Sequence, residues 1–165
     1  MTLAPGIRML LLPGVVLTGG AHAACLVLAS HPDGRSLAQV EVADARPAFT
    51  IAYVHSVTRT PVEERYRVDG STIVGTEIRF RQHGPGLPTE ADPGGSWRRE
   101  GDVFVVTMQR PHETIAMRVH ADQSPRLSVA GDPRPVDLAQ WGNRSLALAA
   151  RAGACLTEPG GSGAR

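Results

Sequence analysis

Two short stretches of the sequence carry residue types that could do chemistry. The first, residues 55–64, reads HSVTRTPVEE and combines a histidine, several hydroxyls, an arginine and two carboxylates. The second, residues 84–88, reads GPGLP, whose glycines let backbone approach a ligand closely. We expect both at one end of a β-sheet, where the candidate binding residues are His55, Ser56, Arg59, Thr60, Pro61, Glu63, Glu64, Gly84, Gly86 and Leu87.

No familiar catalytic pattern accounts for these residues. His55 and Ser56 are neighbours on a predicted strand, so their side chains point to opposite faces and cannot form a nucleophile–base pair. His55 with Glu63 or Glu64 supplies two metal ligands, whereas a zinc site needs three or four. We therefore predict no catalytic residue, no metal and no cofactor, and keep a hydrolase or metal enzyme with an unfamiliar site as a second alternative.

The cluster has a structural and a functional interpretation. His55 shares its predicted strand face with the apolar residues at 49, 51 and 53, which is typical of a hydrogen-bonded core histidine, with Glu64 as its partner. Alternatively, His55, Arg59 and Glu63 line a small-molecule site, where the Arg59 guanidinium would bind a carboxylate.

The elements that must position this cluster are mostly strands, because hydrophobicity alternates with a period of two. The predicted strands are 25–29, 36–42, 48–57, 64–68, 72–82, 103–109, 114–120 and 126–130, the sixth and seventh forming a hairpin around 110–113. About eight such strands predict an all-β fold, an antiparallel sandwich or open barrel. Residues 145–152, SLALAARA, predict a short C-terminal helix. Residues 83–102 predict a long Gly- and Pro-rich loop whose Trp97 packs back on the body of the domain.

The N-terminal segment has the parts of a secretory signal. Arg8 precedes an apolar run over residues 9–17, and Ala21-His22-Ala23 predicts cleavage before Ala24. We thus expect a signal peptide over 1–23, a single β domain over 24–157 and a disordered tail over 158–165, in a periplasmic or secreted protein. No other segment approaches the length of a membrane span, so no membrane insertion is expected after cleavage; a retained anchor and lipidation of Cys25 are the alternatives.

Cysteine use and charge restrict the function further. Cys25 and Cys155 are the two cysteines, and in an oxidising compartment they predict one structural disulfide. Without Arg8, the 17 basic residues become 16 and equal the 16 acidic ones. Such a balance argues against a nucleic-acid partner, which would favour a basic face.

The two motifs also carry a family resemblance. YVHSVTRTPVEERYRV at residues 53–68 and the GPGLP loop are similar to the bacterial family called domain of unknown function 1850 (DUF1850), over roughly residues 25–138, although Pro85 stands where a small residue such as alanine is expected. Members of that family are small exported proteins, commonly encoded beside tripartite (TRAP-type) transporters, particularly those with a TAXI-type binding protein. The resemblance implies an accessory or interaction role in solute uptake, with a transporter subunit or its solute-binding protein as partner. A small-molecule binding protein is the alternative.

Overall fold

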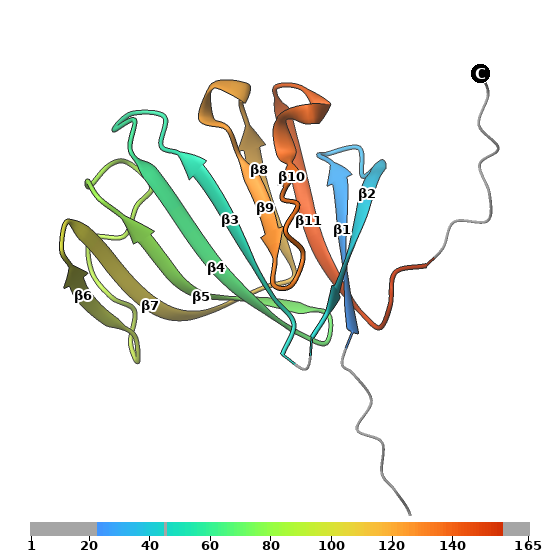
Figure 1. The fold of residues 1–165 in the computed structure, drawn as a ribbon, viewed down its shortest axis with the longest axis horizontal. Coiled ribbons are helices and arrows are strands. Elements are labelled where there is room, and N and C mark those ends of the chain that lie inside the picture. The colour runs from blue at the N-terminus through green and yellow to red at the C-terminus, as the bar shows by residue number, and fades with distance from the viewer. Residues whose placement is uncertain (1–22, 45, 157–165) are drawn as a thin grey trace, which may run out of the picture.

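The computed structural model describes residues 23–44 and 46–156, and nearly all of the regular structure there is β-strand. Two antiparallel sheets pack face to face without closing into a barrel, which confirms the all-β prediction and decides it for the sandwich (Figure 1). The predicted signal peptide, apart from its last residue, and the predicted tail lie outside the described residues. In the described part of the chain, no helix is long and apolar enough to cross a membrane.

The smaller sheet has the strand order β2-β1-β11-β8. Its strands are β1 (Ala23–Ser30), β2 (Ser36–Ala43), β8 (Thr114–Val119) and β11 (Arg144–Ala152). The larger sheet has the order β10-β9-β3-β4-β5-β7-β6. Its strands are β3 (Ala48–Val54), β4 (Pro61–Asp69), β5 (Thr72–Phe80), β6 (Ser96–Glu100), β7 (Val103–His112), β9 (Arg126–Val129) and β10 (Val136–Asp137). Two short 3₁₀ turns, η1 (Ala121–Gln123) and η2 (Leu138–Trp141), lie in the connections that follow β8 and β10.

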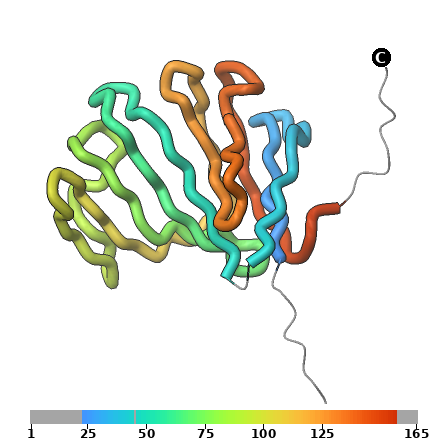
Figure 2. The backbone as a smooth tube through the Cα atoms, viewed as in Figure 1, coloured from blue at the N-terminus to red at the C-terminus, as the bar shows by residue number. Residues whose placement is uncertain are grey.

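The predicted C-terminal helix is wrong, because residues 144–152 form strand β11. This strand pairs with β1 on one side and with β8 on the other, and Figure 2 shows the first and the last described strands side by side. Leu146, Leu148 and Ala150 are buried at every second position. Backbone pairing from two neighbours and a period-two buried face outweigh the high helix propensity of leucine and alanine, which is worth only a fraction of a kcal/mol per residue.

The predicted hairpin between residues 103–109 and 114–120 is also wrong. β7 pairs with β5 and β6, whereas β8 pairs with β11 in the other sheet. His112 still pairs with Ile73 of β5, so Glu113 alone connects β7 to β8. A tight hairpin needs at least two loop residues, so the chain passes from one sheet to the other here instead of reversing.

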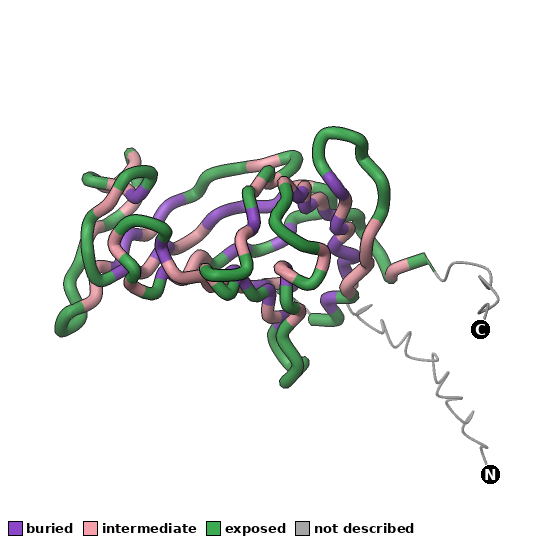
Figure 3. Tube along the Cα trace, turned by 90° about the horizontal axis from the view of Figure 1, so that it is seen from above, coloured by how far each residue is buried: buried purple, intermediate pink, exposed green. Residues whose placement is uncertain are grey.

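The interior is divided into two apolar clusters, both of which include residues from the inner face of the larger sheet. Figure 3 shows buried positions inside the molecule and exposed ones along its outer loops. The first cluster lies between the two sheets and includes Leu26, Phe49 and Leu148. The second includes Ile78 and Phe80 from the larger sheet and Leu87 from the loop that follows β5. One part of the inner face is therefore covered by the smaller sheet, and another part by the loop.

That loop is shorter than predicted, since residues 96–100 form edge strand β6. Trp97 lies on this strand, where its ring stacks parallel to that of His83 at 5.6 Å between centroids. It also meets Phe80 edge-on at 5.9 Å and lies 5.7 Å from Phe104. The packing of Trp97 on the body of the domain, together with backbone pairing to β7, holds β6 in the sheet.

The predicted disulfide is present. Cys25 on β1 and Cys155 after β11 are bonded with 2.05 Å between the sulfur atoms, and their Cα atoms are 4.8 Å apart. The bond closes a loop of 130 residues, so it ties the first described strand to the last.

Candidate functional site

His55 follows β3 and holds the turn that leads into β4. Its side chain is only 5% exposed, and its Nδ1 accepts hydrogen bonds from the backbone N–H groups of Val57 and Thr58, both at 3.2 Å. Since Nδ1 is an acceptor, the proton is on Nε2, which donates to the carbonyl oxygen of Pro85 at 3.0 Å. His55 thus joins the turn over residues 55–60 to the GPGLP loop. Its side-chain partner is a backbone carbonyl, whereas the sequence predicted Glu64.

Gly84 shows why the GPGLP loop needs a glycine beside this histidine. A Cβ built on Gly84 would lie 2.8 Å from His55 Cε1 and 2.8 Å from Thr58 Cγ2, closer than real Cβ contacts. Gly86 has φ of +85°, in the left-handed region that glycine adopts without strain. Leu87 donates its N–H to the Gly84 carbonyl at 3.1 Å and packs into the second apolar cluster. The loop is therefore held in place by two features, its tight turn and the buried side chain of Leu87.

Three of the remaining residues of the turn are exposed, and the other two, Thr58 and Thr60, are half-buried. Ser56 is exposed, and so is Val57, of which 66% is accessible. Arg59 has φ of +55° and donates from its guanidinium to Asp122 at 3.0 Å, an exposed ion pair with the η1 segment. Thr60, whose hydroxyl lies 2.9 Å from that of Thr58, precedes Pro61, the first residue of β4. The guanidinium of Arg59 is thus paired with Asp122 of the same chain.

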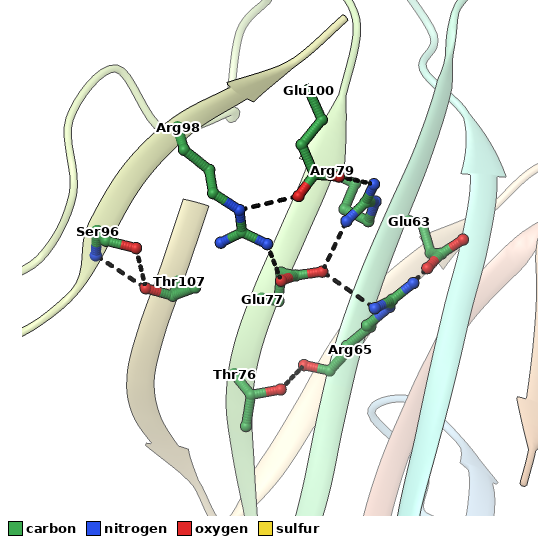
Figure 4. A network of polar contacts seen from close by, with 9 residues as sticks. All are labelled: Glu63, Arg65, Thr76, Glu77, Arg79, Ser96, Arg98, Glu100 and Thr107. Carbon is green, nitrogen blue, oxygen red and sulfur yellow. Dashed lines mark hydrogen bonds and ion pairs between the residues drawn. The ribbon is translucent and has the colours of Figure 1, made fainter. Parts of the chain in front are cut away.

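Glu63 and Glu64 lie on opposite faces of β4. Glu63 is on the outer face, where it accepts a hydrogen bond from Arg65 at 2.7 Å. Arg65 belongs to a balanced network of three arginines and three glutamates, which crosses the sheet to β6 in Figure 4. At its centre is Glu77, whose side chain is 14% exposed and contacts all three arginines: Arg65, Arg79 and Arg98. This network links the strands on the outer face, and the carboxylate of Glu63 is engaged in it by Arg65.

Glu64 points inward, into a cluster with the two tyrosines of the chain. Tyr53 on β3 donates its hydroxyl to Glu64 Oε1 at 2.8 Å, and Tyr66 on β4 donates to Oε2. Burial, and after it the negative charge of Glu64, raises the pKa of both tyrosines well above the ordinary phenol value. Both hydroxyls therefore stay protonated as donors, and Glu64 accepts on each oxygen.

Glu64 also lines two cavities on the inner face. One, of about 280 Å³, lies between β3–β4 and edge strand β8 and is walled by Ile51, Tyr53, Ile115 and others. The second, of about 160 Å³, lies toward the GPGLP loop and is lined by Gly86, Pro88, Met108 and further residues of β5 and β7. The strip of β4 around Glu64 is thus left open between the smaller sheet and the loop.

The structure therefore divides the predicted site among three places. His55, Gly84, Gly86 and Leu87 hold turn and loop together; Ser56, Arg59 and Thr60 belong to the exposed turn; Glu63 and Glu64 lie on opposite faces of the sheet. Tyr53 and Tyr66 were missing from the prediction. The signal for Tyr66 was available, because residues two apart on a strand share a face, so Glu64 had to point the same way as Tyr66. Within residues 23–44 and 46–156, no group of three or more His, Cys, Asp or Glu side chains could hold a metal ion.

Comparison with known families gives one match. The family model of a domain of unknown function, DUF1850, matches residues 49–136, just over half of the chain. The chain belongs to the DUF1850 family. The matched span contains the 55–60 turn, the GPGLP loop and the Tyr53–Glu64–Tyr66 cluster, while both disulfide cysteines of this DUF1850 protein lie outside it. No curated protein and no solved structure matches the chain significantly.

Proposed function

We propose that this DUF1850 protein is an exported accessory protein that docks on a component of TRAP-type solute uptake through the turn over residues 55–60. The observation that carries the proposal is the solvent exposure of Val57. A large apolar side chain is 66% exposed at the tip of a turn that part-buried hydrogen bonds to His55 hold together.

The rigidity of this turn favours a binding role. His55 anchors the turn through two accepted backbone hydrogen bonds and one donated to the loop. Arg59 anchors its other side to Asp122. A loop that is already ordered loses little conformational entropy on binding, so more of its contact energy appears as affinity. An exposed apolar residue with a charged rim is typical of the centre and edge of a small interface.

Two further observations support export and the kind of partner. The Cys25–Cys155 disulfide suits an oxidising compartment, as the sequence of residues 1–23 predicts. The family resemblance implies the neighbourhood of a TRAP-type transporter, so the partner proposed is one of its subunits or its solute-binding protein. Binding of a carboxylate by Arg59 is less well supported, because that guanidinium is paired with Asp122.

Site-specific cross-linking in the native host tests this proposal. A photo-reactive amino acid is placed at position 57 of the tagged protein, and a control at Arg134, whose side chain is 90% exposed on the turn between β9 and β10. We expect position 57 to cross-link to a TRAP subunit or solute-binding protein and position 134 not to do so. Val57→Asp should weaken co-purification of the same component.

Equal cross-linking from both positions, or none from position 57 in a properly exported and oxidised protein, would overturn the proposal. Alanine variants of His55 and Glu64 are poorer probes, because His55 is buried and Glu64 lies on the inner face. A loss of partner in those variants would report a change in the fold as readily as a lost contact.

A further inference from the structure

The carboxylate of Glu64 differs from the three other glutamates of its sheet in having no cation beside it. On the outer face, Glu63, Glu77 and Glu100 each form ion pairs with arginines. Among the described residues, no arginine or histidine lies within ion-pair distance of Glu64; both of its oxygens accept from tyrosine hydroxyls instead. A partly buried carboxylate without a counter-charge is costly, so such a group invites a cation from outside.

The cavities beside Glu64 have walls that suit an aliphatic chain. The larger one, about 280 Å³, has Ile51, Ile115, Met117 and Pro125 among its lining residues. That volume is near the lower end of the range for small-molecule sites, about 300 Å³. The ring of Tyr53 also lines it, and the face of an aromatic ring attracts cations. One charged acceptor among apolar and aromatic walls is the usual composition of a site for an organic ammonium ion.

None of the three arginines that line these cavities neutralises Glu64. Arg65 forms ion pairs with Glu63 and Glu77 on the outer face. Arg110 lines the smaller cavity, but it forms a two-point ion pair with Asp92, at 2.5 and 2.6 Å. Arg118 lines the larger cavity from the edge of β8; its side chain is exposed and donates to His120 at 3.3 Å. Solvent screens the charge of an exposed guanidinium far more than that of a half-buried carboxylate.

We propose that the cavity between β3–β4 and β8 binds a small molecule with a protonated aliphatic amine, and that Glu64 is its counter-charge. Tyr53 and Tyr66 hold the two carboxylate oxygens in place, and each oxygen keeps a further lone pair for the ammonium N–H groups. This site is separate from the turn over residues 55–60 and does not depend on the docking role proposed for it.

Isothermal titration calorimetry of the mature, oxidised protein with n-butylamine tests the inference, with 1-butanol and butyrate as neutral and anionic ligands of similar size. We expect saturable binding of n-butylamine at one site, and weaker binding of the other two by about tenfold or more, the effect of losing one charge-assisted hydrogen bond. Glu64→Gln should weaken n-butylamine binding by a similar factor. Glu63→Gln is the matched control, because it removes the same charge one residue away on the outer face, and should leave binding unchanged.

Ile115→Trp gives a second test that keeps the carboxylate, since the larger side chain fills the cavity from β8. Ile115→Trp should reduce n-butylamine binding while circular dichroism shows the native fold. The inference can then still be tested if Glu64→Gln fails to fold. Absence of saturable n-butylamine binding, equal affinity for butyrate, or unchanged binding in Ile115→Trp would each overturn the inference. Tighter binding of Nα-acetyl-lysine methylamide than of n-butylamine would assign the cavity to a lysine of a protein partner and overturn the small-molecule assignment.

Discussion

Alkaline pH should destabilise this protein through the Tyr53–Glu64–Tyr66 cluster. The chain has two tyrosines, both in this cluster, and no lysine. Its two cysteines are joined in the disulfide, so they do not titrate. Between about pH 9 and 12, phenol ionisation is therefore the main side-chain titration of the chain.

The direction and size of the effect follow from the raised pKa of both phenols in the folded state. In the unfolded chain each tyrosine loses its proton near pH 10, whereas the folded protein keeps both protons. Stabilisation from the cluster is thus fully present below about pH 10 and is lost as pH rises toward the folded-state pKa. Each retained proton costs about 1.4 kcal/mol of unfolding free energy per pH unit, so two tyrosines cost about 2.7 kcal/mol per unit. A domain of ordinary stability, about 5 kcal/mol or somewhat more, would then unfold near pH 12.

Two measurements made in parallel test this. Urea unfolding at stepped pH gives the slope, and the absorbance of tyrosinate reports ionisation. We expect tyrosinate to appear together with unfolding in the wild type. In Glu64→Gln it should appear at a lower pH, but still above 10, because burial is the larger cause of the shift and it remains. Tyrosinate forming near pH 10 in a protein that is still folded, or an unfolding free energy that stays flat to pH 12, would refute this reasoning.

The remaining predictions concern the two features that tie distant parts of the chain together. Gly84→Ala should destabilise the protein by about 1–3 kcal/mol in urea unfolding, because the new methyl group would lie 2.8 Å from His55 Cε1. Gly75→Ala is its control, with a nearest atom at 3.6 Å and a change expected within about 1 kcal/mol; equal effects at both positions would contradict the packing argument. The double variant Cys25→Ser, Cys155→Ser should lose up to about 5 kcal/mol, the chain-entropy value for a closed loop of 130 residues. A variant with the unfolding midpoint of the wild type would show that the bond contributes nothing to stability.

Local pattern was sufficient for much of the larger sheet. The alternation over residues 64–68 correctly put Tyr66 and Val68 inside and Arg65 outside, because the period of a strand depends only on backbone geometry. Cysteine count predicted the disulfide, since two cysteines allow only one pairing within the chain. Residues 145–152 were misread because their side chains suit a helix, and only the flanking strands β1 and β8 make a third strand more stable there.

What the tertiary structure decided is which distant groups meet. The sequence alone does not predict that His55 donates to the carbonyl of Pro85, 30 residues away, because that contact exists only once the GPGLP loop has folded onto the sheet. The same holds for the passage of β7 into β8, which depends on β5 keeping its pairing with His112. The charge environment of Glu64 is also a property of the fold. Residue type supplies a carboxylate. The choice of face separates it from Arg65, which neutralises its neighbour Glu63, and leaves it between two tyrosines and a cavity.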